Sequence, residues 1–214
     1  MDPPSMSKQR ITSKTDARDV RNICVYCGSG VGKSSAYRAA ARTLGEALAQ
    51  QGIGLVYGGG NIGLMGEIAH ATLNHGGRVT GIIPQFLTRR EHMLREVDEL
   101  IVTQDMHERK RLMFERSDAF VALPGGVGTL EELVEQLTWV QLGRHTKPVI
   151  VANIEGFWDP FLNILNHMKA DGFIRSGVNV HFTVVDDATK IVPAIIAAAA
   201  KRVPARDEAI LTKF

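Results

Sequence analysis

Two adjacent cations lie in a segment whose helical repeat points them inward. The segment is DMHERKRLMFER at 105–116, and its repeat places Arg109 and Lys110 on the same side as Met106 and Met113. Cations that face inward need an anion, and the planar fork of an arginine suits a phosphate group. The same positions would also suit side chains that extend along an apolar surface to solvent, or that pair with a buried carboxylate for structural reasons.

A carboxylate follows in the segment PGGVGTLEE at 124–132. Thr129 and Glu132 have the spacing of a capping box, in which two side chains close the N-terminus of a helix. A helix that begins there turns Glu132 away from its apolar stripe, so this side chain is not expected in the core. Glu132 could cap the helix, or it could position water or sugar hydroxyls opposite Arg109, and both roles stay open. The stripe consists of Leu130, Leu133, Val134 and Leu137.

Three glycine-rich loops accompany these charges. They are CGSG at 27–30, YGGGN at 57–61 and LPGGVGT at 123–129, and each follows a short apolar run of strand type. The carboxyl ends of parallel strands meet at one edge of a sheet, so we expect the three loops to converge there. Glycines let backbone amides approach a ligand, and helix N-termini attract phosphate.

The stretch CGSGVGKSS at 27–35 looks at first like the phosphate loop of an ATPase. Residues 32–34 fit the second half of G-x-x-x-x-G-K-[ST], but Cys27 stands where the first glycine should be. The apolar strand before Pro124 also lacks the terminal Asp that would hold magnesium. A dinucleotide fingerprint fits no better, because the glycines within 28–32 are spaced G-x-G-x-G.

The two cysteines, Cys24 and Cys27, form a C-x-x-C. They could be a redox pair, but the thioredoxin motif opens a helix, whereas these residues close a strand, where cysteine acts as a small hydrophobe. A zinc site would need further ligands, and the seven histidines show no metal-binding spacing. We predict no metal site.

The elements that must position these residues alternate along the chain, which implies a parallel sheet with helices on both faces. We therefore predict an α/β fold, a single Rossmann-like, doubly wound domain over 21–201, with a flexible tail at 1–20 and a C-terminal tail at 202–214. Strands are predicted near 21–27, 53–57, 78–83, 98–102, 118–123, 147–152 and 181–185. Helices are predicted near 34–51, 63–75, 105–116, 129–143, 159–171 and 187–201.

Composition limits the classes of partner. The chain has 214 residues and a formal net charge of +2, with no basic stripe that would indicate nucleic acid. It has no apolar run of about 18 residues, and its first residues lack the apolar centre of a secretory signal. We expect a cytoplasmic protein that uses neither nucleic acid nor a membrane as a partner.

Taken together, the motifs resemble those of the Lonely guy family, phosphoribohydrolases that act on cytokinin nucleoside 5′-monophosphates. The resemblance rests on YGGGNIGLMG at 57–66, on Met106 to Lys110 and on Pro124 to Glu132, and the family pattern extends from 21 to about 196. It implies hydrolysis of the N-glycosidic bond through an oxocarbenium-like sugar. It implies no cofactor and no metal. Relatives have been labelled lysine decarboxylases, yet nothing here indicates a pyridoxal phosphate site.

The resemblance also implies roles for individual residues. Glu132 would stabilise the sugar cation or activate water, and Arg109 would be the second catalytic residue. The motif at 124–132 would cradle the 5′-phosphate at a helix N-terminus, whereas Lys33 and Ser34 would merely start a helix. The implied substrate contacts are Ser29, Gly59, Gly60, Met106, Lys110, Pro124, Gly125, Gly126, Gly128 and Thr129.

The base that is released stays open at this point. A prenylated adenine needs an apolar pocket beyond the purine, for which Phe86, Met93 and Leu94 are candidates, and plain AMP is a further possible substrate. The resemblance implies a homodimer whose partner helps to close the site, with the helix at 133–142 and Trp139 as a candidate contact. The alternative is a noncatalytic nucleotide- or cofactor-binding protein of the same fold.

Overall fold

The computed structural model describes residues 20–88, 92–174 and 181–201. The predicted tails therefore lie outside the described residues, apart from Val20, which is buried in the core. The predicted domain boundaries at 21 and 201 stay a prediction.

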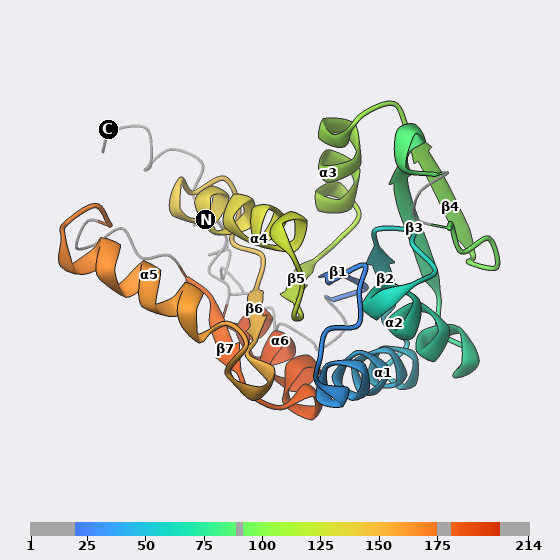
Figure 1. Ribbon diagram of the computed structural model, residues 1–214, viewed down its shortest axis with the longest axis horizontal. Coiled ribbons are helices and arrows are strands. Elements are labelled where there is room, and N and C mark those ends of the chain that lie inside the picture. The colour runs from blue at the N-terminus through green and yellow to red at the C-terminus, as the bar shows by residue number, and fades with distance from the viewer. Residues whose placement is uncertain (1–19, 89–91, 175–180, 202–214) are drawn as a thin grey trace, which may run out of the picture.

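The described residues form one sheet of seven parallel strands in the order β4-β3-β2-β1-β5-β6-β7 (Figure 1). Every strand lies within two residues of its predicted position, since each is a short apolar run bounded by turn residues. The strands are β1 (Asn22–Tyr26), β2 (Gly54–Tyr57), β3 (Val79–Pro84), β4 (Glu99–Thr103), β5 (Ala119–Ala122), β6 (Val149–Ala152) and β7 (Thr183–Val185).

α-Helices connect successive strands, except between β3 and β4, and cover both faces, which confirms the predicted doubly wound α/β class. The α-helices are α1 (Ser35–Gln50), α2 (Gly63–Asn74), α3 (Met106–Glu115), α4 (Val127–Gln141), α5 (Asp159–Ala170) and α6 (Ile191–Ala200). Short 3-10 turns are η2 (Gln85–Leu87), η3 (Ile154–Gly156) and η4 (Ala188–Lys190). The helix predicted from 187 thus begins as η4, and α6 starts only at Ile191.

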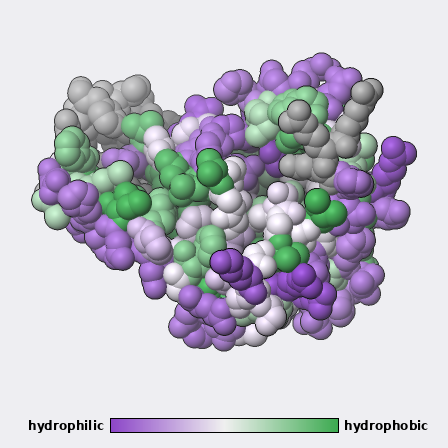
Figure 2. Space-filling model, in the orientation of Figure 1, coloured by the Kyte–Doolittle hydropathy of each residue, from purple (hydrophilic) through white to green (hydrophobic). Residues whose placement is uncertain are grey.

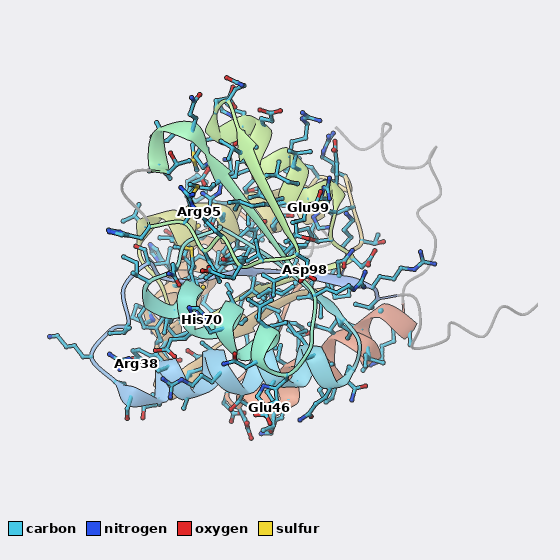
Figure 3. The ribbon with its side chains drawn as sticks, turned by 90° about the vertical axis from the view of Figure 1, so that its right-hand side faces the viewer. Arg38, Glu46, His70, Arg95, Asp98 and Glu99 are labelled. Carbon is cyan, nitrogen blue, oxygen red and sulfur yellow. The ribbon has the colours of Figure 1, made fainter. Side chains whose placement is uncertain are left out.

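Two buried clusters show which helices share a face of the sheet. One cluster joins α1, α2 and α6 to the sheet, and the other joins α3, α4 and α5 (Figure 1). Figure 3 turns the β4 edge toward the viewer, with Arg38 and Glu46 on α1, His70 on α2, and Asp98 and Glu99 at the edge strand. Polar side chains therefore lie on the outside of the α1–α2 layer, as an amphipathic helix requires.

The sheet reverses its direction of growth between β1 and β5. The chain runs from β1 outward to β4, then returns to the other side of β1 to form β5, β6 and β7. At the carboxyl ends of β1 and β5, the N–H of Gly28 donates to the carbonyl of Pro124 at 3.1 Å. Such a reversal leaves a crevice where two loops diverge, and ligands of open α/β sheets bind there.

Candidate active site

Two adjoining cavities open at this point of reversal, and Gly28, Ser29 and Gly126 line both. The α4 cavity has a volume of about 240 Å³ and is lined by the first turns of α4, by Met65 of α2, and by Met106 and Arg109 of α3. The α1 cavity measures about 300 Å³ and is lined by the 28–32 loop, Tyr37, Leu64, Pro124, Gly125 and Phe157. The loops after β1 and β5 thus converge as predicted.

Arg109 lies in the α4 cavity with its guanidinium fixed on several sides. Its side chain is 9% exposed, and Nε donates to the carbonyl of Ile82 at 3.1 Å. Nη1 lies 3.4 Å from Oε1 of Glu132 and 3.8 Å from Sδ of Met106. A β-carbon on Gly58 would lie only 2.5 Å from Nη2, so the guanidinium packs directly on that glycine. These contacts hold Arg109 in one position before any ligand arrives.

The helix that carries Arg109 begins at a well-formed cap. The carboxylate of Asp105 accepts a hydrogen bond of 2.8 Å from the N–H of Glu108, which is the usual role of Asp at this position. That bond lowers the pKa of the Asp105 carboxyl below its ordinary value of 3.8. The cap fixes where the first turn of α3 starts, and therefore which residues face the cavity.

Glu132 faces Arg109 from α4, and its side chain is 8% exposed. Burial is the main cause that raises the pKa of the nearby Cys24 and Cys27 thiols. The negative charge of Glu132 is the second cause and raises the same pKa values further. Burial also raises the pKa of the Tyr26 hydroxyl, with Cys24 and Glu132 as further causes. The catalytic pair that the sequence predicted is therefore assembled in space, buried and in contact.

The predicted capping box is wrong. Helix α4 begins at Val127 with Gly126 as its N-cap, so Thr129 is already the third helical residue and Glu132 lies in the second turn. The Thr129 side chain packs on Gly125 instead, where a β-carbon would lie only 2.2 Å from its Oγ1. A glycine without a side chain thus allows the helix to start two residues earlier. The amides of the first turn, 127–129, point toward the α4 cavity without intrahelical acceptors.

The prediction of which face of α4 is buried is also wrong. Leu133 and Leu137 are buried, but Leu130 and Val134 are exposed. Apolar residues lie on more than one side of α4. The side that packs against the sheet is the one that also carries Thr129, Glu132 and Gln136. The buried residues are Thr129, Glu132, Leu133, Gln136 and Leu137.

Lys110 does not line the cavity and pairs with two carboxylates of α4, of which Glu131 does line it. Its Nζ lies 2.5 Å from Oε1 of Glu131 and 3.0 Å from Oε1 of Glu135, and its side chain is 11% exposed. Burial opposes the charge, but hydrogen bonds to both carboxylates raise the pKa of the Lys110 ammonium overall. The ion-pair alternative of the sequence analysis therefore describes Lys110 in this structure.

The remaining predicted contacts divide into two groups. Gly59 and Gly60 lie outside the lining of both cavities: a β-carbon on Gly59 would meet Ile83, and Gly60 forms a bridge with Met93. Met65 lines the α4 cavity although the sequence analysis did not single it out, and its place in the motif at 57–66 was the available signal. The predicted contacts that line a cavity are Ser29, Met106, Pro124, Gly125, Gly126, Gly128 and Thr129.

The proposed base pocket does not form around the three candidates named from the sequence. Leu94 is buried within the core cluster beneath α1 and α2, and Phe86 is an exposed side chain. Neither residue lines the two cavities, and Met93 does not line them either.

Two other motifs have structural roles. Ser34 is the N-cap of α1, where its Oγ accepts from the N–H of Ala36 at 3.1 Å, as the prediction of a helix start requires. Cys24 and Cys27 are buried and free, and their side chains belong to clusters on opposite faces of the sheet. Two thiols separated by the sheet cannot pair, which excludes the redox alternative.

No helix among residues 20–88, 92–174 and 181–201 is long and apolar enough to cross a membrane. Within the same ranges, no three His, Cys, Asp or Glu side chains gather closely enough to hold a metal ion.

The sequence matches a family described as possible lysine decarboxylase over residues 65–195. A protein of Oryza sativa subsp. japonica, named cytokinin riboside 5′-monophosphate phosphoribohydrolase LOG, is 52% identical over 154 residues. That match covers 72% of this chain and 64% of the rice protein, slightly under two thirds of its length. A second rice protein, named as a probable enzyme of the same kind, is 49% identical over 172 residues, which are 80% of this chain and 76% of that protein.

Among solved structures, the molybdenum cofactor binding protein from the phototrophic bacterium Rippkaea orientalis is similar, with a TM-score of 0.62. The two chains are 23% identical, and the match covers 83% of this chain and 96% of the other. At that identity the likeness shows the fold alone.

Proposed function

Because the chain belongs to the Lonely guy family, we propose that it hydrolyses the N-glycosidic bond of adenosine 5′-monophosphates, plain or N6-modified, to the free base and ribose 5-phosphate. The observation that carries the proposal is the buried pair of Arg109 and Glu132, 3.4 Å apart beside the N-terminus of α4. The proposed domain for this activity is 21–201. A cytoplasmic location stays a prediction.

The first turn of α4 supports binding of the 5′-phosphate. Its amides lack intrahelical partners and the helix N-terminus carries partial positive charge, so 127–129 and the neighbouring Gly126 can hold an anion without a cation. Ser29 also lines this cavity. A phosphate held here places the ribose beside the second turn of α4, where Glu132 lies.

Glu132 and Arg109 then act on the two sides of the breaking bond. Water adds to C1′ while the bond from C1′ to the base nitrogen breaks, and the base leaves with a proton. The carboxylate of Glu132 stabilises the positive charge that develops on the sugar, or accepts the proton of the water. Arg109, held by Ile82, pairs with the carboxylate of Glu132 and orients the sugar phosphate.

A lysine decarboxylase activity has less support from the site. Such enzymes hold pyridoxal phosphate through a lysine Schiff base. The residues that line the two described cavities include no lysine, and the nearby Lys110 is paired with Glu131 and Glu135.

Substitution of Glu132 by glutamine tests the proposal. The variant keeps the shape of the side chain but removes its charge, so we expect base release from AMP and from isopentenyladenosine 5′-monophosphate to fall by about 10²–10⁴-fold. The matched control is Glu115→Gln on the exposed side of α3, which should cleave at the wild-type rate. Free base is measured by chromatography, and AMP affinity is measured by calorimetry and should stay within a few-fold.

Wild-type protein that binds either nucleotide without releasing base would refute hydrolysis and favour the noncatalytic binding protein. Release from the prenylated nucleotide at a higher kcat/KM than from AMP would assign the substrate class. An equal kcat/KM for both nucleotides would show that the enzyme does not discriminate between the two bases.

The proposed assembly is a homodimer. Hydrophobic residues gather over α4 and α5 on the face shown in Figure 2. Val127, at the start of α4, is exposed and also lines the α4 cavity, so a second copy seated against α4 would help to close the site. Trp139 packs edge-on against Phe114 at 4.9 Å, so the contact would form through the exposed residues instead. Those residues are Val127, Leu130, Val134, Leu142, Ile164, Met168 and Phe173.

A further inference from the structure

The α1 cavity is the larger of the two cavities at the point of reversal, and the bond that breaks in the proposed reaction does not lie in it. Its volume of about 300 Å³ is about twice that of a ~150 Å³ cavity that accepts a benzene ring, so it has room for a base of two rings. Arg109 and Glu132, which the proposed reaction places at the breaking bond, line only the α4 cavity. The α1 cavity can therefore take a group other than the reacting sugar.

Two aromatic rings from opposite layers of the fold meet on the wall of the α1 cavity. Tyr37 of α1 and Phe157, between η3 and α5, are half-buried, and their ring centroids lie 5.6 Å apart, edge to face. Among the described residues, those that line this cavity carry no charge. A neutral wall with aromatic side chains suits a flat ring, because nucleic-acid bases stack on such side chains. The other lining side chains are Ser29, Val31, Leu64 and Pro124.

Three glycines beside the cavities are not required by the packing of the chain. A β-carbon on Gly30, Gly126 or Gly128 would meet no described atom within 4 Å, and none of the three has a positive φ. Gly30 lines the α1 cavity, Gly128 lines the α4 cavity, and Gly126 lines both. Glycine loses more conformational freedom on folding than any other residue, so a glycine that neither packing nor backbone requires indicates the close approach of a ligand. The α1 cavity thus carries the same sign of ligand contact as the α4 cavity.

The two cavities join at the phosphate end of the proposed site. The residues common to both are Gly28, Ser29 and Gly126, next to the start of α4 where the 5′-phosphate is proposed to bind. Arg109 and Glu132, at the sugar end, do not line the α1 cavity. A group in the α1 cavity is therefore joined to the nucleotide through its phosphate, and not through the base that leaves. Dinucleotides bind across such a reversal of strand order, with the pyrophosphate at a helix N-terminus.

We propose that the α1 cavity is a subsite for the second ring of a dinucleotide, whose pyrophosphate lies at the start of α4 and whose reacting sugar lies in the α4 cavity. The inference rests on the proposed function for the position of the first phosphate. Tyr37 and Phe157 contact the second ring, and Gly30 and Gly126 let the ligand pass close to the backbone. The subsite forms without the usual fingerprint, since the glycines within 28–32 are spaced G-x-G-x-G.

The experiment compares the binding of AMP, ADP-ribose and diadenosine 5′,5″-diphosphate, which consists of two AMP units joined through their phosphates. Affinities are measured by calorimetry on full-length Glu132→Gln protein, so that no nucleotide is consumed. ADP-ribose has the same pyrophosphate and second ribose and lacks only the second adenine. We expect diadenosine diphosphate to bind at least about fivefold more tightly than ADP-ribose, which is the lower end of the effect of stacking one base.

Two variants, each combined with Glu132→Gln, locate the second ring. Gly30→Leu adds a side chain to the lining of the α1 cavity where the fold leaves space, and Tyr37→Leu removes an aromatic ring. Each should lower the affinity for diadenosine diphosphate at least about fivefold and leave that for AMP within twofold. Gly30→Leu decides the test if Tyr37→Leu folds poorly. The matched control is Gly128→Ala, which narrows only the α4 cavity and should weaken all three ligands alike.

Three results overturn the inference. The first is diadenosine diphosphate that binds no more tightly than ADP-ribose, and the second is a Gly30→Leu protein that keeps the full difference between them. The third is a Gly30→Leu protein that loses AMP affinity by the same factor, which places the base of AMP itself in the α1 cavity. Wild-type protein that releases no base from AMP refutes the proposed function but leaves the binding comparison intact. A protein that binds none of the three ligands refutes both.

Discussion

Replacing Gly58 by alanine places a methyl group where the guanidinium of Arg109 lies. The added carbon would stand 2.5 Å from Nη2 of Arg109 and 2.9 Å from Sδ of Met65. Ordinary contacts at such a carbon begin near 3.4 Å, so Nη2 has to retreat by about 1 Å. Both obstructing atoms are the far ends of flexible side chains, and the backbone of Gly58 does not have a positive φ. The fold can therefore accept the methyl group, but Arg109 cannot keep its position.

The expected loss follows from the role of Arg109 beside Glu132. A displacement of about 1 Å in a residue that orients the reacting groups costs on the order of 100-fold in rate, or about 2.7 kcal/mol of activation free energy. The free energy of unfolding should change by less than about 1 kcal/mol, because the conformation suits alanine. Activity and stability should thus separate in this variant.

The assay is steady-state release of free base from the nucleoside monophosphate that wild type cleaves, combined with urea unfolding followed by circular dichroism. The matched control is Gly52→Ala, where φ is +67° and no atom lies within 4 Å of the added carbon. There the strain of a left-handed alanine should lower stability by about 1 kcal/mol and leave kcat unchanged.

If Gly58→Ala retains kcat within twofold of wild type, the packing of Arg109 on Gly58 has no catalytic importance, and the prediction is wrong. It also fails if the variant loses activity only in proportion to a loss of folded protein. We expect Gly58→Ala to lose activity with little change in stability, whereas Gly52→Ala should lose stability with little change in activity.

Three further predictions concern the buried thiols and the exposed apolar face. Burial raises the pKa of Cys24 and Cys27 above the ordinary 9.0, so a disulfide reagent at pH 8 should label native protein far more slowly than unfolded protein, and fast labelling would contradict their burial. Because these native pKa values are raised, the thiols' contribution to stability is full below pH 9.0 and falls as the pH rises above it, which should lower the urea midpoint between pH 9.0 and about 11. Val134→Glu should shift sedimentation velocity from dimer to monomer, whereas Gln51→Glu, at the exposed C-cap of α1 in the other helical layer, should leave the dimer intact; a wild-type monomer would refute the proposed assembly.

The sequence by itself determined the elements and the edge at which they meet. Short apolar runs separated by amphipathic segments can only form parallel strands with crossover helices, so all seven strands lie close to their predicted positions. Glycine-rich loops after β1 and β5 had to converge for the same topological reason. Arg109 could also be singled out, because an inward cation is visible in a helical repeat. Glu132 was indicated by its place in the motif, since the apolar stripe expected to exclude it is not the buried side of α4.

Only the tertiary structure decided which side of α4 is buried and which partner each cation takes. Leucines and valines lie on several sides of α4, and a repeat that is apolar on more than one side cannot indicate which side meets the sheet. The start of α4 depended on whether Thr129 could pack against Gly125, a contact of side chain on backbone that no helical pattern records. Arg109 and Lys110 are adjacent in sequence, yet they reach different carboxylates because the angle between α3 and α4 is set by packing on the sheet.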